Sequence, residues 1–97
     1  MTAYLIVNYD IDDAELYGDY QGGAGPALRI GTECQLLVLE GASTVLEGSP
    51  GQQTVVLEFE DKDKAREIYE SGEYQAVIGK RHQATSNHFA VLVDKFG

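Results

Sequence analysis

Arg81 is the residue whose position in this chain most directly predicts a chemical role. Tyr74, Val77 and Ile78 recur at helical spacing, and Arg81 continues the same apolar stripe one turn later. A guanidinium at such a position points toward the core or into a cleft, and it cannot lose its proton there. Because an unpaired buried charge is costly, we expect a carboxylate, a group of acceptors or a bound anion beside it.

Glu58 is the carboxylate that we expect to face Arg81. It lies between Leu57 and Phe59 in an apolar segment, where a carboxyl group needs a partner or acquires a raised pKa. An Arg81–Glu58 pair fits a ligand site, but it also fits a purely structural ion pair. A solvated Glu58 is equally compatible with the sequence.

Tyrosines are the second group of candidates for a pocket. Six of the nine aromatic residues are tyrosines, and those on helical stripes can either pack as core residues or line a cavity. Asn8 is the polar exception in an apolar segment and could orient a ligand. The candidate ligand-binding residues are therefore Asn8, Tyr20, Glu58, Tyr74 and Arg81, and no catalytic residue is assigned.

Other motifs favour structural roles. The GGAG run at residues 22–25 has Leu28 where a dinucleotide fingerprint needs its third glycine, and it lacks the lysine of a nucleotide-triphosphate loop. His82 and His88 do not have the spacing that places two metal ligands on one helix face, so we expect no metal site. Cys34 is the only cysteine, which excludes an intrachain disulfide and favours a small buried side chain over a nucleophile.

Composition predicts one domain over residues 1–97 that gains from a partner. A chain of 97 residues buries only about 60 to 65% of its unfolded surface, so a shared core would help it. Its 16 acidic and 7 basic residues give a net charge of -9, which disfavours nucleic acid and anionic membrane surfaces as partners. No apolar run is long enough to span a bilayer and no basic leader is present, so we expect a cytoplasmic protein.

Periodicity and capping residues predict four main strands and a set of helices between them. The first helix should begin at Asp12 or Asp13, reach about Ile30 and kink at Pro26. Later helices should start near Asp61 or Asp63 and at Glu73, capped by Ser71 and ending near Thr85. The expected strands are Ala3–Ile11, Cys34–Glu40, a short flanking strand Thr44–Glu47, Gln53–Phe59 and Phe89–Val93.

The resulting order, β-α-β-β-α-β, is that of an α+β ferredoxin-like fold. In this fold a four-stranded antiparallel sheet carries the helices on one face. The predicted strands are nevertheless apolar on both faces, so one layer of helices is not enough to cover them. We therefore expect a homodimer in which two sheets pack face to face as a dimeric α/β barrel.

Several segments together carry a resemblance to the DUF1330 family: AYLIVNYDI (3–11), GPA (25–27), VLEG (45–48), VLEF (56–59) and the stretch from Ala65 through IYESGEYQ (68–75) to Arg81. The resemblance covers nearly the whole chain and implies a ferredoxin-like protein of the dimeric α/β-barrel superfamily with no established activity. Where family members commonly have a paired glycine and a Ser-Pro-Glu-Tyr run, this chain has GT (31–32) and SGEY (71–74).

Two functions are compatible with these features. In the first, a pocket between sheet and helices binds or transforms a small organic ligand, which can be an anion. Arg81 would neutralise the ligand, Glu58 or a tyrosine would exchange a proton, and Asn8 would orient it. The resemblance makes the cofactor-free oxygenases and haem-degrading enzymes of the superfamily relevant by analogy only, and no cofactor is expected. In the second, the protein is a noncatalytic dimeric structural or interaction module.

Overall fold

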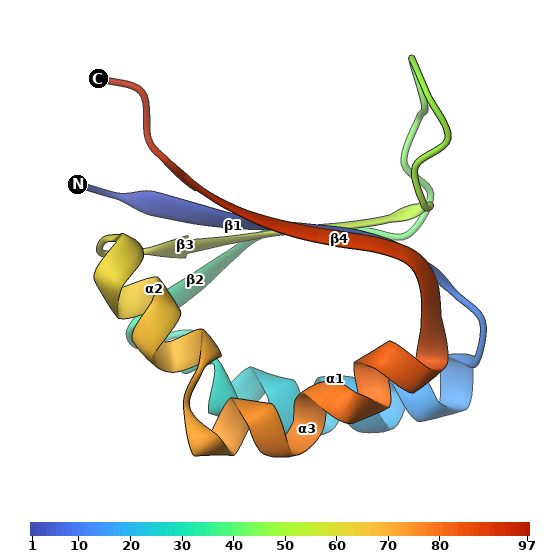
Figure 1. Cartoon of the computed structure of the whole chain (residues 1–97), viewed down its shortest axis with the longest axis horizontal. Helices are drawn as coiled ribbons and strands as arrows, with labels where there is room; N and C mark the ends of the chain where they lie inside the picture. The colour runs from blue at the N-terminus through green and yellow to red at the C-terminus, as the bar shows by residue number, and fades with distance from the viewer.

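The computed structural model describes every residue, Met1–Gly97, and places all the helices on one face of a single sheet (Figure 1). The strands lie in the order β2-β3-β1-β4, and each neighbouring pair is antiparallel. This confirms the predicted α+β ferredoxin-like fold. The elements are β1 (Ala3–Ile11), α1 (Ala14–Ala27), β2 (Cys34–Glu40), β3 (Gln53–Phe59), α2 (Lys62–Tyr69), α3 (Gly72–Ala84) and β4 (Thr85–Asp94).

The helices begin where side-chain caps are available. Asp13, Asp61 and Ser71 each accept a hydrogen bond from a backbone N–H in the first turn of α1, α2 and α3, respectively. The first helix ends at Ala27, earlier than predicted, one residue after Pro26. Proline supplies no N–H to continue the hydrogen-bond ladder, and the chain then turns through Arg29, which has a φ of 60°.

The expected flanking strand Thr44–Glu47 does not form. Residues 41–52 are instead a loop that rises on the side of the sheet away from the helices (Figure 1). Ser43 donates both its backbone N–H and its hydroxyl to the carbonyl of Gln52, which closes the loop on itself. Conversely, β4 starts at Thr85, before the predicted Phe89, because Thr85 and Ser86 pair with the end of β1.

The two faces of the sheet are in different environments. Leu5 and Val7 of β1 are buried beneath the helices, whereas Ile6 between them points to the opposite face and pairs with Val91 of β4. We call this second, helix-free side the bare sheet face. It comprises Tyr4, Ile6, Asn8, Gln35, Val38, Glu40, Thr54, Val56, Glu58, Phe89, Val91 and Val93. Phe89 and Val91 remain 48% and 44% exposed, so the chain alone leaves an apolar surface in contact with water.

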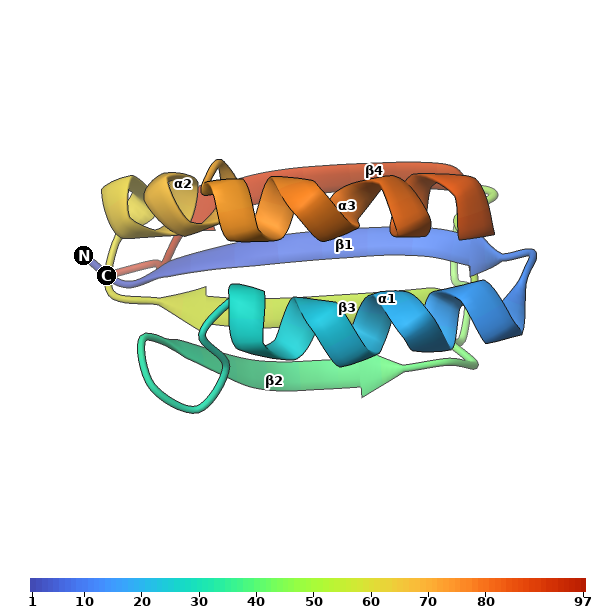
Figure 2. The ribbon, with the colours of Figure 1, turned by 90° about the horizontal axis from the view of Figure 1, so that it is seen from below.

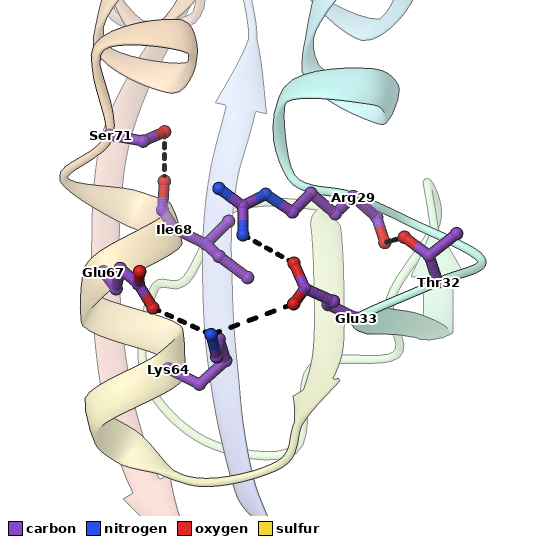
Figure 3. A network of polar contacts seen from close by, with 7 residues as sticks. All are labelled: Arg29, Thr32, Glu33, Lys64, Glu67, Ile68 and Ser71. Carbon is purple, nitrogen blue, oxygen red and sulfur yellow. Dashed lines mark hydrogen bonds and ion pairs between the residues drawn. The ribbon is translucent and has the colours of Figure 1, made fainter.

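An ion-pair network ties the turn after α1 to α2 (Figure 3). Glu33 accepts from Arg29 at 2.5 Å and lies 3.8 Å from Lys64, which in turn contacts Glu67 at 2.9 Å. These groups lie at the surface in contact with solvent, so each pair adds little to stability. The network nevertheless links the segment that leads from α1 into β2 with the neighbouring helix.

Candidate ligand-binding pocket

A cavity of about 250 Å³ lies between the helices and the sheet. Its sheet wall is apolar and is made by Leu5, Val7, Val55, Leu57, Leu36 and Leu39. Exposed lining residues, among them Gln21 of α1 and Leu36 and Leu39 of β2, mark the mouth. Tyr74 and Arg81 of α3 are almost fully buried and mark the deep end. Figure 2 shows β2 as the edge strand of the sheet, beside α1.

Helical spacing places the polar residues of the cavity. On α1, Tyr17, Tyr20 and Ala24 follow one another at intervals of three and four residues and are all buried. On α3, Tyr74 and Arg81 lie seven residues apart, which is two turns, and share one buried face. The two helices therefore present a joint tyrosine and arginine surface to the sheet.

Glycine at position 23 allows these helices to approach closely. A Cβ atom there would lie 2.8 Å from Cγ1 of Val77 on α3, which is too close for a side chain. Gly25 of the same run lines the cavity without filling it. The GGAG run therefore lies within α1 and serves helix packing and cavity shape, in agreement with the prediction that it is not a phosphate loop.

Two pairs of tyrosine hydroxyls form the polar end of the cavity. Tyr9 and Tyr17 are joined by a 2.5 Å hydrogen bond, and Tyr20 and Tyr74 by one of 2.6 Å. Burial raises the pKa of Tyr9, Tyr20 and Tyr74 above the ordinary value for a phenol. The hydroxyls of Tyr9, Tyr20 and Tyr74 consequently remain protonated at neutral pH and act as hydrogen-bond donors, not as bases.

Arg81 lines the same cavity without a carboxylate partner. The residue is only 4% exposed, and its guanidinium carbon lies 5.7 Å from the ring centroid of Tyr9. A hydrogen bond joins its Nη2 to Nε2 of His82 at 3.4 Å, and Tyr69 is a second hydrogen-bonding neighbour of the side chain. Its Nε is buried and has no hydrogen-bond partner. An unpaired donor on a buried cation is energetically costly, and a bound hydrogen-bond acceptor would lower that cost.

The predicted pairing of Arg81 with Glu58 is wrong. No ion pair joins the two residues, because Leu57, the neighbour of Glu58 in β3, points toward the helices. Alternation along a strand then directs Glu58 to the opposite face, where its cross-strand neighbours are Tyr4 and Gln35. Glu58 therefore cannot neutralise Arg81 or exchange a proton with a molecule in this cavity.

Asn8 also lies outside the cavity, although it is buried. Its side chain donates to the carbonyl of Gly51 and to the hydroxyl of Thr54, and it accepts from the backbone N–H of Gly51. These bonds anchor the loop between β2 and β3. A Cβ atom at Gly51 would lie 2.1 Å from the carbonyl carbon of Tyr9, so the loop backbone crosses directly over β1. The structure thus assigns Asn8 a structural role.

Of the five candidates, the structure brings Tyr20, Tyr74 and Arg81 together in the cavity. The candidate set omitted two further lining residues, Tyr9 and Tyr17. Strand alternation with Leu5 and Val7 could have identified Tyr9. One-turn spacing from Tyr20 already placed Tyr17 on the correct stripe.

The remaining reactive side chains do not contribute to the cavity. Cys34 is fully buried, and burial raises the pKa of its thiol to about 11, which makes it a poor nucleophile. His82 and His88 stack with ring centroids 5.6 Å apart, outside the cavity. No group of three or more histidine, cysteine or carboxylate side chains is arranged to hold a metal ion. None of the helices combines the length and apolarity needed to cross a membrane.

The family is decided by a sequence comparison. The sequence model for DUF1330, described as a domain of unknown function, matches residues 2–96. The chain belongs to this family. Comparison of the DUF1330 chain with curated protein sequences found no match.

Solved structures share the fold of this DUF1330 protein at low sequence identity. A protein of unknown function from Rhodopseudomonas palustris is 14% identical with a TM-score of 0.79, covering 99% of this chain and 83% of that one. A DABB family protein from Mesorhizobium loti with a ferredoxin-like fold is 11% identical with a TM-score of 0.72, covering 99% and 98%. A ferredoxin-like protein of unknown function from Thermobifida fusca, described as dimeric, is 14% identical with a TM-score of 0.67, covering 98% and 92%.

Proposed function

We propose that this protein binds a small organic molecule in the cavity between its sheet and its helices. The observation that carries the proposal is the buried Arg81, which has no carboxylate partner and an unused Nε donor in a cavity with an apolar sheet wall. Pockets that combine an apolar wall with a few convergent polar groups are typical ligand sites.

The size of the cavity supports a ligand of modest dimensions. Its volume of about 250 Å³ exceeds the roughly 150 Å³ of an engineered cavity that holds benzene. It falls just below the roughly 300 to 1,000 Å³ typical of sites for drug-sized molecules. A molecule with one ring or a short branched chain would fit.

The lining residues favour binding over chemical transformation. No carboxylate, imidazole or thiol side chain lines the cavity, so it lacks the usual general bases. Burial raises the pKa of Tyr9, Tyr20 and Tyr74, which keeps their hydroxyls protonated. We therefore propose a binding protein in preference to an enzyme.

A paired substitution on α1 tests whether the cavity is the binding site. Ala24 is buried and lines the cavity, so Ala24→Leu would fill part of it. The matched control is Ala14→Leu, which adds the same atoms at an exposed position of the same helix. A panel of small organic molecules should raise the melting temperature of the wild type and of Ala14→Leu, but not of Ala24→Leu. Equal shifts in both variants would place binding elsewhere.

We also propose that two copies pair through the bare sheet face. Its exposed apolar residues, among them Phe89 and Val91, are what such an interface would cover, and the neighbour from Thermobifida fusca is described as dimeric. Sedimentation velocity at micromolar concentration should show a dimer for the wild type and for the control Gln83→Lys on the outside of α3. Val91→Lys should shift the protein to monomer. A monomeric wild type would contradict the proposal.

A further inference from the structure

We infer that the cavity selects a monocarboxylate with a small apolar body, an inference that rests on the proposed function. The properties of the lining that bear on the ligand are its hydrogen-bond donors, its acceptors and its charges. Each of these quantities restricts the ligand in a different way.

The polar end of the cavity has more hydrogen-bond donors than acceptors for them. Within each tyrosine pair one hydroxyl donates to the other, so the second hydroxyl hydrogen has no partner in the protein. This is true both of Tyr9 with Tyr17 and of Tyr20 with Tyr74. The buried Nε–H of Arg81 adds a third unused donor. The lining therefore holds three donors without a partner: one hydroxyl of each tyrosine pair and Nε of Arg81.

Strong acceptors are missing from the same surface. The lining includes no carboxylate or imidazole side chain, and its one side-chain amide, Gln21, is exposed at the mouth. A ligand that brings its own N–H or O–H donors would bury them without a strong acceptor, at a cost of about 1 to 3 kcal/mol each. A ligand with acceptor atoms at its buried end would satisfy the donors of the protein. This excludes amines and disfavours alcohols.

The positive charge of Arg81 favours a carboxylate over a neutral hydrogen-bond acceptor. The ion pairs of the protein all lie on its surface, and none includes Arg81. An amide or ester could accept hydrogen bonds but would leave the buried positive charge uncompensated. A carboxylate accepts hydrogen bonds and also compensates the positive charge. Its two oxygens match the planar donor geometry of a guanidinium. The geometry at Arg81 thus favours a planar anion.

The rest of the cavity limits the ligand to one such group. Arg81 is the only cationic residue of the lining, and the sheet wall opposite is made of leucine and valine side chains. A second carboxylate would either be buried against this wall without a counter-charge or remain in the mouth, where it prevents full entry. The body of the ligand should therefore be hydrocarbon, of about the size of one aromatic ring.

Isothermal titration calorimetry at pH 7 with four probes of matched size tests this inference. The probes are benzoate, benzamide, benzylamine and terephthalate, which vary the charge and number of polar groups on one ring. Charge-assisted hydrogen bonds to a buried cation should make benzoate bind the wild type about 30-fold more tightly than benzamide. Benzylamine should not bind, and terephthalate should bind less tightly than benzoate.

Variants at Arg81 assign the preference to the guanidinium. Arg81→Met keeps a side chain of similar length without charge, and it should weaken benzoate binding about 100-fold and benzamide binding much less. Arg81→Lys keeps the charge but not the planar fork and should give an intermediate affinity. The comparison of probes on the wild type does not depend on either variant folding.

The outcomes distinguish the inference from the function on which it rests. Equal binding of benzoate and benzamide by the wild type, abolished for both by Ala24→Leu, would overturn the carboxylate preference and retain the pocket. Tighter binding of benzylamine than of benzoate would also overturn the carboxylate preference. Failure of all four probes to bind at millimolar concentration, with no difference between the wild type and Ala24→Leu, would overturn both.

Discussion

Replacing Arg81 by methionine should make the unliganded protein more stable. The guanidinium is buried without a carboxylate partner, so its desolvation is poorly compensated in the absence of ligand. Substituting apolar residues for buried charged groups can stabilise a protein by about 1 to 4 kcal/mol. The lost contact between the guanidinium and the Tyr9 ring, 5.7 Å away, offsets about 0.5 to 2 kcal/mol of this. We expect a net gain of about 1 to 2 kcal/mol.

Urea denaturation at one protein concentration measures this gain. Each 1 kcal/mol should also raise the melting temperature by about 4 to 8 °C in a domain of this size. Arg81→Ala is the control for volume, since it removes the charge but enlarges the cavity, at about 24 cal/mol per Å³ of added space. Arg81→Ala should consequently be less stable than Arg81→Met. Glu58→Gln should not alter either result, because Glu58 lies on the opposite face of the sheet.

A loss of stability in Arg81→Met would refute this reasoning. A decrease of about 3 to 5 kcal/mol is the size expected when one partner of a buried ion pair is removed and the other is left uncompensated. If Glu58→Gln then restored much of that loss, the two residues would be energetically coupled as a structural pair. Arg81 would in that case serve the fold, and the argument for a ligand would lose its main support.

Three further changes have expected outcomes. Tyr20→Phe and Tyr74→Phe should each cost about 1 kcal/mol in urea denaturation, while the double variant costs less than the sum because no hydroxyl is left unpaired. Gly51→Ala should lower the melting temperature, because the added Cβ would collide with the backbone of Tyr9; an unchanged melting temperature would mean that the loop can move. Burial and the nearby guanidinium lower the pKa of His82, so unfolding takes up a proton below about pH 6.5 and the free energy of unfolding should fall there; His82→Gln should reduce this fall.

Local patterns predicted most of the fold. Three strands have the predicted limits, because runs of β-branched and apolar residues bounded by turn residues are a local property of the chain. The caps at Asp13, Asp61 and Ser71 were predictable for the same reason. The start of β4 was not, because its first residues are polar and join the sheet only through pairing with the distant end of β1. That pairing has no signature in the local sequence.

The site was predictable only in part, for a related reason. A helical stripe is enough to predict that Arg81 is buried, since its position relative to Ile78 is local. Alternation likewise separates Glu58 from its neighbours in β3. Alternation does not predict which face of the strand the helices cover. The helices cover the face of Leu57, and Glu58 is therefore absent from the cavity. The pairing of Tyr9 with Tyr17 also joins a strand to a helix and depends on how the two pack.

The net charge of -9 gives a final test, because it opposes the local charge of the cavity. A carboxylate approaching the protein meets a repulsive overall field, which slows association. After binding, it lies beside Arg81 in a buried site that salt screens weakly, since the Debye length of about 10 Å at 0.1 M salt describes charges in solvent. Added salt should therefore raise the association rate of benzoate and change its dissociation rate little. If salt instead accelerates dissociation as strongly as it does for an exposed ion pair, the anion is bound on the surface and not at the deep end of the cavity.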